Sequence, residues 1–376
     1  MLELTIYTKN GIKHYMTKIE LENVTKFFGG KKVIDNVSIS VESGDRTAIL
    51  GPDKAGKSTL LSLIAGIEKP DGGRIYFDGK DVTRYPPQKR NIGMLVQTFA
   101  LYPNLNVYEN IASPLRARGL TTEEIDREVK EQAKSLGIDD ILHHYPYEIS
   151  GGECQRVATA RALVKKAAVY LLDEPFTNLD YKLKESMRVE LKRILDKGKG
   201  TIILATPDPE EALIFAKTLV FLYDGKVLQK GPIEECYSKP ASISVGKYFS
   251  KPMMNLIEAP LVQKNKRSVL NISDELQLDV THLNLPEECV VGLRPHNLYL
   301  VKEREGMLTI SPTLELQENA GSEMIVRMKL DGSSLTMYTP FVKRLKEKSL
   351  RIFVDPCDFY IFSKKTGKFI TKYQRG

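Results

Sequence analysis

Cysteine is scarce in this sequence of 376 residues, and the four cysteines that occur lie far apart without a CxxC pair. This spacing argues against a disulfide framework and against a cysteine-ligated metal site. We therefore predict four reduced thiols, as in a cytosolic protein. They are Cys154, Cys236, Cys289 and Cys357.

Long apolar stretches are also missing. No run approaches the roughly 18 residues that a membrane-spanning helix needs. The first ten residues include an acid and no unbroken apolar segment, so they do not resemble a signal peptide. We expect the protein to stay in the cytoplasm and to reach a membrane only through a protein that spans it. Residues 1–15 are predicted to be an N-terminal extension, or to be absent if translation starts at Met16.

A concentrated basic surface is absent too. The net charge of +7 is spread along the chain, and no basic stripe with interleaved aromatic residues argues for a nucleic-acid partner. We predict that the excess charge lies on a solvated surface that tolerates an anionic membrane leaflet. What is present is an ordinary globular composition, with 42% hydrophobic and 27% charged residues, in a chain long enough for two or three domains.

Short apolar runs alternate with helical patterns through the first part of the chain. Such runs suit strands that are covered on both faces of a largely parallel sheet. Their alternation with helices predicts an α/β layer fold over residues 16–240. Residues 98–165 are more charged and follow a helical pattern, which predicts an inserted helical subdomain. The apolar runs are residues 167–172, 201–205 and 218–222, and residues 46–50 are predicted to be the strand before a glycine-containing turn.

The pattern changes after this α/β region. Residues 241–254 are predicted to be a connector. From Asn255 onward, short alternating strands are separated by turn dipeptides such as Asp331-Gly332. This pattern predicts a small β-barrel over residues 255–376.

The sequence from Gly51 to Ser58 fits GxxxxGK[ST], a P-loop, and lies between a predicted strand and a predicted helix as that motif requires. Backbone N–H groups and the helix N-terminus favour bound phosphates. Lys57 can pair with the β- and γ-phosphates, and the Ser58 hydroxyl can ligate Mg²⁺. A chance glycine-rich turn is the alternative, which the flanking elements argue against. Asp53 is unusual in an anion-binding loop and is expected to point into solvent. We predict that ATP is bound by Gly51, Pro52, Asp53, Lys54, Ala55, Gly56, Lys57, Ser58 and Thr59.

An apolar strand that ends in two acids, Asp173 and Glu174, has the Walker B pattern. Alone the pattern is weak, because many strands end in acids where they reach solvent. Combined with a P-loop, it predicts that Asp173 holds Mg²⁺ and that Glu174 polarises the attacking water.

Residues Ile149–Arg156 resemble the LSGGQ signature of ABC ATPases, with isoleucine in place of leucine and glutamate in place of glutamine. A serine and two glycines at a helix start form a second nest for phosphate. Taken alone the segment is an ordinary helix cap, but its place between the P-loop and the Walker B acids favours the signature. The resemblance implies that Ser150, Gly151 and Gly152 bind the γ-phosphate of an ATP held by another subunit.

Other positions follow the order of motifs in the ABC family. Gln97 resembles the Q-loop glutamine, which implies a contact with Mg²⁺ and the attacking water and a role in sensing the membrane subunit. Residues Asn178–Asp180 resemble the D-loop. Phe28 lies where the family places the aromatic residue that stacks on adenine, although a phenylalanine after a strand can also be core packing.

The second half of the chain adds a narrower resemblance. Three segments resemble sequence motifs of the sugar-importer ATPases related to the maltose transporter: residues 291–295, 318–323 and 355–368. The similarity extends over residues 16–370. It implies an OB-like regulatory (TOBE) barrel after the ATPase domain. It also implies a peripheral position on the inner face of the cell membrane. The implied partners are permease subunits, a second ATPase subunit and, indirectly, an extracytoplasmic solute-binding protein.

One position departs from the family. Where the family has a switch histidine, this sequence has Pro207, which offers no N–H donor to the γ-phosphate. In this respect the chain resembles importers of glycerol and related polyols that carry two different ATPase subunits, one of which lacks the histidine. None of the five histidines lies near this position; they are His14, His143, His144, His282 and His296.

Two hypotheses follow from these residues. In the first, which Glu174 favours, the chain hydrolyses ATP to energise uptake of a carbohydrate or polyol, glycerol being one candidate. In the second, which Pro207 favours, its own site is catalytically weak and the chain is the ATP-binding partner of a second, active ATPase in a heterodimer. A DNA-repair ABC ATPase is disfavoured, because no long coiled-coil insertion separates the P-loop from the signature.

Overall fold

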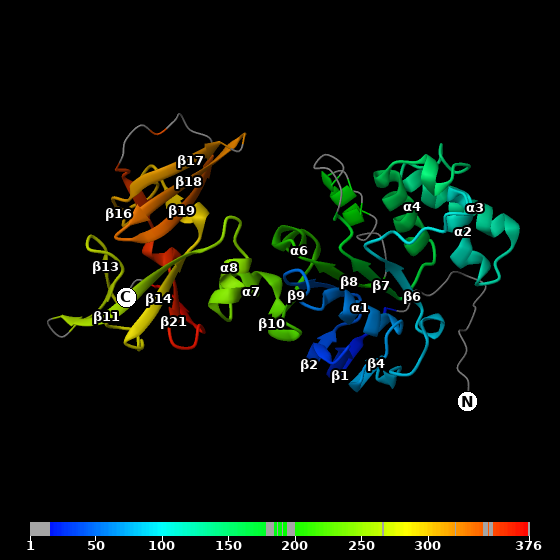
Figure 1. Ribbon diagram of the computed structural model, residues 1–376, viewed down its shortest axis with the longest axis horizontal. Coiled ribbons are helices and arrows are strands. Elements are labelled where there is room, and N and C mark those ends of the chain that lie inside the picture. Colours follow the sequence, from blue (N-terminus) through cyan, green and yellow to red (C-terminus); the bar gives the residue numbers. More distant parts are fainter. Residues whose placement is uncertain are drawn as a thin grey trace. The chain divides into compact units, whose positions relative to one another are not determined.

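The computed structural model describes most of the chain, in two compact units that divide between Ile233 and Glu234 (Figure 1). The described residues are 16–177, 184–185, 187–189, 191–193, 200–264, 267–319, 321–340, 345 and 349–374. No helix within these ranges is long and apolar enough to cross a bilayer.

The described residues of the first unit form two sheets, and they confirm the predicted α/β fold class. Four antiparallel strands have the order β2-β1-β4-β5, and six strands have the order β10-β9-β3-β8-β7-β6, with parallel pairing from β9 to β6. The first sheet consists of β1 (Ile19–Phe28), β2 (Lys31–Val41), β4 (Gly72–Phe77) and β5 (Lys80–Asp81). The second consists of β3 (Arg46–Leu50), β6 (Ile92–Leu95), β7 (Val169–Asp173), β8 (Thr201–Thr206), β9 (Thr218–Tyr223) and β10 (Lys226–Pro232).

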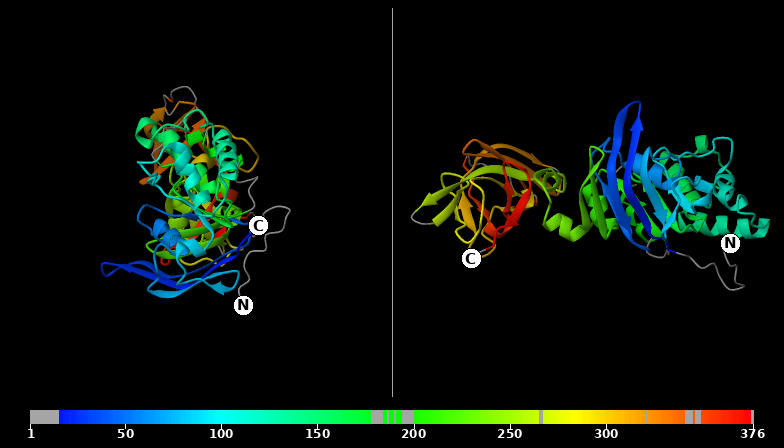
Figure 2. Two further views of the ribbon diagram at one scale, coloured as in Figure 1. Left: turned by 90° about the vertical axis from the view of Figure 1, so that its right-hand side faces the viewer. Right: turned by 90° about the horizontal axis from the view of Figure 1, so that it is seen from below.

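One apolar core joins both sheets to helix α1 (Lys57–Ala65). Every residue of β7 and β8 is buried, as expected for apolar runs that are covered on both faces. The β1–β2 hairpin, blue in Figure 2, contributes Val24 to the core that also holds Ile49 and Leu61. The parallel register brings the carboxyl ends of β3, β7 and β8 to one edge of the sheet, which is where α/β proteins usually bind ligands.

Three α-helices occupy the stretch in which the sequence predicts a helical subdomain. They are α2 (Val107–Arg116), α3 (Thr122–Ser135) and α4 (Gly151–Leu163). Each begins after a polar residue whose side chain accepts a backbone N–H: Asn106, Thr121 and Ser150. The helices share an apolar core that includes Ile111 and Val129. The shorter elements of this unit are α6 (Pro209–Phe215) and two 3₁₀ turns, Pro87–Lys89 and Pro146–Glu148.

The second unit is rich in β-strands. Its described strands form antiparallel sheets with the orders β13-β12-β11-β14-β21-β22, β15-β20-β16 and β17-β18-β19, and they share one apolar core. Burial alternates along β18, as the alternating sequence predicts. The strands are β11 (Asn255–Lys264), β12 (Arg267–Asn271), β13 (Gln277–Asp279), β14 (Glu288–Leu293), β15 (Leu298–Tyr299), β16 (Leu308–Ile310), β17 (Thr313–Asn319), β18 (Glu323–Leu330), β19 (Ser333–Pro340), β20 (Ile352–Val354), β21 (Tyr360–Ser363) and β22 (Phe369–Lys372).

The stretch predicted as a connector contains a short helix, α8 (Ile243–Tyr248), which follows α7 (Ile233–Ser238). The Ile243 N–H donates to the Gly367 carbonyl oxygen at 2.9 Å, and Val245 is buried, so α8 is packed within the second unit. The sequence did not predict this helix.

Arg294, from one of the segments that carry the family resemblance, is only 1% exposed in the second unit. Its guanidinium donates to the carbonyl oxygens of Tyr237 and Phe249 at 2.7 and 3.2 Å. It also lies 3.7 Å from the centroid of the Tyr237 ring. These contacts hold the segment that contains Tyr237 and Phe249 against the strands.

Candidate nucleotide-binding site

The loop between β3 and α1 lies close to neighbouring backbone. The Gly51 N–H donates to the Thr206 carbonyl oxygen at 3.4 Å, and a Cβ on Gly51 would lie 2.0 Å from the carbonyl oxygen of Leu222. Gly56 has a φ of +104°, and a Cβ there would lie 2.9 Å from the carbonyl oxygen of Val33. Packing therefore requires glycine at both positions, and at Gly56 the left-handed backbone conformation requires it as well.

Replacing Gly51 by alanine is expected to destabilise the first unit, because a methyl group cannot fit against the Leu222 carbonyl. Overpacking of this kind costs about 1–3 kcal/mol, which should lower the melting temperature of the full chain by several degrees. The matched control is Gly151→Ala, since no atom lies within 4 Å of the position of a Cβ on Gly151. Equal melting temperatures for Gly51→Ala and the wild-type chain would contradict the close approach.

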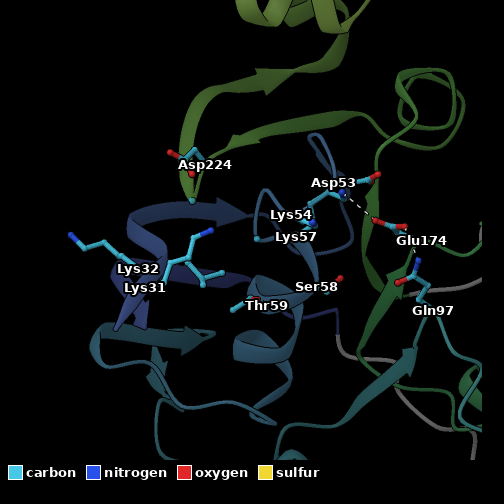
Figure 3. A pocket seen from close by; sticks show the side chains of 13 residues that line it. Lys31, Lys32, Asp53, Lys54, Lys57, Ser58, Thr59, Gln97, Glu174 and Asp224 are labelled. Carbon is cyan, nitrogen blue, oxygen red and sulfur yellow. Dashed lines mark hydrogen bonds and ion pairs between the residues drawn. The ribbon is translucent and has the colours of Figure 1, made fainter. Parts of the chain in front are cut away.

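Lys57 is buried beneath the loop, with 3% of its surface exposed. Its Nζ donates to the carbonyl oxygens of Gly51 and Pro52, at 3.0 Å each, and lies 3.2 Å from Oε1 of Glu174. Figure 3 marks the ion pair with Glu174 by a dashed line. Because α1 begins at Lys57, the lysine charge and the first N–H groups of the helix both attract phosphate.

Glu174 follows the end of β7 in a left-handed backbone conformation, with a φ of +47°. Its N–H donates to the Ala205 carbonyl oxygen at 2.9 Å. Its carboxylate accepts a hydrogen bond from Nε2 of Gln97 at 3.2 Å and from Oγ1 of Thr177 at 3.3 Å. Together with Lys57, these partners orient the carboxylate, and the structure brings Gln97 and Glu174 together (Figure 3).

Ser58 and Asp173 also meet, since Oγ of Ser58 donates to Oδ1 of Asp173 at 3.0 Å. Burial raises the pKa of the Asp173 carboxyl group, and the Ser58 hydrogen bond and the Lys57 charge oppose this shift. A hydroxyl and a carboxylate are hard oxygen ligands of the kind that Mg²⁺ takes from a protein, the other ligands being waters and phosphates.

A permanently held metal would need more ligands than this pair. In the ranges that the structure describes, no group of three or more His, Cys, Asp or Glu side chains could hold a metal ion. The donor set of Ser58 and Asp173 fits a Mg²⁺ ion that arrives with the phosphates of a nucleotide.

Lys57, Ser58, Gln97 and Glu174 line a pocket of about 430 Å³, whereas Asp173 does not. Among the residues that the sequence predicts for ATP binding and catalysis, its lining includes Asp53, Lys54, Gly56, Lys57, Ser58, Thr59, Gln97 and Glu174. Asp53 is exposed, as predicted. Gly51, Pro52 and Ala55 belong to the loop without lining the pocket. Five further lining residues were not predicted from the sequence: Lys31, Lys32, Val33, Asp224 and Gly225.

The missed residues come from β2 and from the turn between β9 and β10. The Gly225 N–H donates to the Ala55 carbonyl oxygen at 3.0 Å, and the Asp35 N–H donates to the Gly225 carbonyl oxygen at 2.9 Å. The turn is therefore bonded both to the P-loop and to β2. The dipeptide Asp224-Gly225 is a turn signal in the sequence, but nothing local indicates which segments it contacts.

The segment that resembles the ABC signature forms the start of α4. Ser150 and Glu153 make a capping box, in which the Glu153 N–H donates to Oγ of Ser150 at 3.3 Å and the Ser150 N–H donates to Oε2 of Glu153 at 2.8 Å. The bond from the Ser150 backbone lowers the pKa of Glu153 below its usual value. Ser150, Gly151 and Gly152 do not line the pocket, so the structure does not bring them to the P-loop of their own chain.

Comparison with known proteins agrees with this geometry. The family model described as "ABC transporter" matches residues 34–177. The chain is 34% identical to the trehalose/maltose import ATP-binding protein of Thermococcus litoralis, an alignment that covers 94% of this chain and 100% of that protein. The chain belongs to the ATP-binding subunits of ABC transporters. The resemblance found in the sequence is thereby confirmed.

Other relatives of this ABC subunit are also import proteins. The glucose import ATP-binding protein of Saccharolobus solfataricus is 39% identical, over 77% of this chain and 81% of that protein. An sn-glycerol-3-phosphate import ATP-binding protein of Rhizobium etli is 35% identical, over 94% of this chain and 99% of that protein. Among solved structures, the dimeric ATP-binding cassette MJ0796 bound to ADP and Pi is 30% identical, with a TM-score of 0.53 over 57% of this chain and 98% of that chain.

Phe28, for which the sequence predicts stacking on adenine, is at the end of β1. Its side chain is 44% exposed, which rules out core packing, and Nζ of Lys26 lies 5.0 Å from the ring centroid. Phe28 does not line the pocket, and stacking on adenine stays a prediction. The segment that resembles the D-loop, Asn178–Asp180, lies outside the described residues.

Proposed function

We propose that this ABC subunit binds ATP in the pocket above the P-loop and hydrolyses it to energise the import of a carbohydrate or polyol. The observation that carries the proposal is the meeting of Lys57, Gln97 and Glu174 in one pocket, with Ser58 hydrogen-bonded to Asp173 beside them. These residues supply the parts that phosphoryl transfer needs: a fixed positive charge, a base, a group that orients water, and oxygen ligands for a metal ion.

Binding of the phosphates would change the partners of Lys57. The phosphates bring negative charge to the ammonium group that otherwise faces Glu174 at 3.2 Å. The Glu174 carboxylate is then available to a water beside the γ-phosphate, with Gln97 within hydrogen-bonding distance of the same carboxylate. In this role Glu174 is the general base, a contribution of about 10²–10⁴-fold to the rate.

Mg²⁺, when bound with ATP, would neutralise part of the negative charge of the phosphates. The residues that would hold it are Ser58 and Asp173, with Gln97 as a further contact. The hydrogen bond of 3.0 Å between Ser58 and Asp173 already holds their two oxygens together.

The signature residues would act on a second subunit. Ser150, Gly151 and Gly152 do not line the pocket of their own chain, and the solved relative MJ0796 is dimeric. Pro207 supports a partner of a different kind, because proline has no N–H to donate to the γ-phosphate. An ATPase that retains the switch histidine would complete such a heterodimer.

The same proposal places the chain in the cytoplasm, on the inner face of the cell membrane, through permease subunits. An extracytoplasmic solute-binding protein would deliver the substrate on the other side. The named substrates of the relatives, which are trehalose and maltose, glucose, and sn-glycerol-3-phosphate, support a carbohydrate or polyol, with glycerol as one candidate.

A transport assay tests the function. The full chain, its permease subunits and the second ATPase would be placed in liposomes, and uptake of labelled glycerol and of labelled sugars would be measured with and without ATP. We expect uptake that requires ATP and is abolished by Glu174→Gln. Uptake that is equal without ATP would overturn the proposal.

Residues 255–376 would form a regulatory OB-like barrel; they make up most of the second unit, which begins at Glu234 and also contains the predicted connector, residues 241–254. The ATPase domain, predicted over residues 16–240, would correspond to the first unit, which ends at Ile233. All residues that line the pocket come before β10. A chain truncated after Lys251 is therefore expected to bind ATP with an affinity within about threefold of the full chain, a difference of less than about 1 kcal/mol. Titration calorimetry measures this, and loss of binding in a folded truncated chain would contradict the boundary.

A further inference from the structure

The carboxyl end of β8 carries a buried cluster of charged side chains. Thr206, the last residue of β8, is fully buried, and its hydroxyl donates a hydrogen bond to Oε2 of Glu211 in α6. Glu211 is 3% exposed. Its Oε1 lies 2.8 Å from Nζ of Lys184 and 3.8 Å from the guanidinium of Arg188. A buried carboxylate with two cationic partners is thus bonded to the end of a central strand.

Asp208 closes the cluster from the other side. Its N–H donates to Oγ1 of Thr206 at 3.0 Å, which makes a side-chain turn over two residues. Its carboxylate lies 3.2 Å from Lys184 and 3.6 Å from Arg188. Pro207 fixes the backbone between Thr206 and Asp208. Lys184 and Arg188 therefore both face the carboxylates of Asp208 and Glu211, and Arg188 also pairs with Glu185 at 2.7 Å and with Glu210 at 3.5 Å. The corner after β8 is held by backbone and side chains together.

The backbone of this corner supports two parts of the nucleotide site. The carbonyl oxygen of Ala205 accepts the N–H of Glu174 at 2.9 Å. The carbonyl oxygen of Thr206 accepts the N–H of Gly51, the first residue of the P-loop, at 3.4 Å. A displacement of the end of β8 would therefore move the Glu174 backbone and the start of the P-loop together.

We propose that Thr206 and Glu211 are positioning residues for ATP hydrolysis, which act through the backbone of Ala205 and Thr206 on Glu174 and Gly51. The inference rests on the proposed function of the pocket. A shift of about 1 Å in a reacting group can cost about a hundredfold in rate. We call the connection from Glu211 through Thr206 to Glu174 and Gly51 the link. Because the phosphates are held mainly from the start of α1, the link affects turnover more than it affects the affinity for ATP.

Thr206→Val tests the link, because it removes the hydroxyl and keeps the branched shape. In the full chain we expect a loss of about tenfold in the rate of ATP hydrolysis and of less than about threefold in ATP affinity, as for a misplaced catalytic group. Glu211→Gln should act in the same direction, whereas Thr206→Ser, which keeps the hydroxyl, should restore the rate. Wild-type turnover in Thr206→Val would overturn the proposal.

The control is Glu128→Gln. Glu128 also has a largely buried carboxylate, 2.5 Å from Nζ of Lys166, but it belongs to α3. Neither Lys166 nor Arg127, its ion-pair partners within the described ranges, lines the pocket. It should keep the wild-type rate of hydrolysis. An equal loss of rate in Glu128→Gln would show that any broken ion pair has this effect and would overturn the link.

Amide hydrogen exchange gives a second readout that does not need hydrolysis. The N–H groups of Gly51 and Glu174 should exchange faster in Thr206→Val than in the wild-type chain, because they donate to the carbonyl oxygens of Thr206 and of its neighbour Ala205. They should not exchange faster in Glu128→Gln. Unchanged exchange at both amides would overturn the proposal. If the wild-type chain bound ATP but never hydrolysed it, the proposed function would be wrong. The exchange rates at Gly51 and Glu174 would still show whether Thr206 and Glu211 position these two residues.

Discussion

Replacing Lys57 by alanine is expected to lower the affinity of the full chain for Mg-ATP by more than a factor of about 100. A hydrogen bond from a charged group contributes about 1.5–3 kcal/mol, and each 1.4 kcal/mol is a tenfold change in affinity. Lys57 is buried at the start of α1 and would make at least two such bonds to the phosphates. Titration calorimetry with Mg-ATP measures the loss.

Lys226→Ala is the matched control for this change. Lys226 belongs to the same unit and forms an exposed ion pair with Asp35, at 3.3 Å, but it does not line the pocket. We expect its ATP affinity to equal that of the wild-type chain. If a folded Lys57→Ala chain bound ATP as tightly as Lys226→Ala, the assignment of the P-loop as the phosphate site would be wrong.

Replacing Glu174 by glutamine is expected to reduce ATP hydrolysis by about 10²–10⁴-fold, the usual contribution of a general base. Binding of ATP should be retained. The reason is that the amide keeps the shape of the side chain but no longer places a negative charge 3.2 Å from Lys57, where it competes with the phosphates. Phosphate release and ATP binding are measured on the same preparation, so that loss of turnover is separated from loss of binding.

Glu68→Gln serves as the control for Glu174→Gln. The Glu68 carboxylate also faces a lysine, Lys26, at 3.2 Å, but it lies outside the pocket lining. Its turnover should match the wild-type rate. A loss of turnover of less than about threefold in Glu174→Gln would be far smaller than the loss expected from removing a general base. Another group would then have to polarise the water.

The sequence by itself determined the parts of the site that are contiguous in the chain. The strand, the loop from Gly51 to Ser58 and the helix after it are consecutive, and the P-loop function depends on the residue types within this one segment. The acids at the end of β7 could be predicted for the same reason, since Asp173 and Glu174 directly follow an apolar run. The change from an α/β pattern to alternating strands after Asn255 was visible because the periodicity of apolar residues itself changes.

Only the tertiary structure decided what closes around these segments. Strand β3 lies between β8 and β9, which come more than 150 residues later, and no local pattern specifies that order. It is this pairing that puts the Leu222 carbonyl against Gly51 and the Asp224-Gly225 turn at the pocket. The connection from Glu211 through Thr206 to Glu174 likewise joins residues whose proximity depends on the packing of α6 beside β8. Local sequence specifies turns, caps and strand ends, whereas contacts between distant segments depend on how all the strands pair at once.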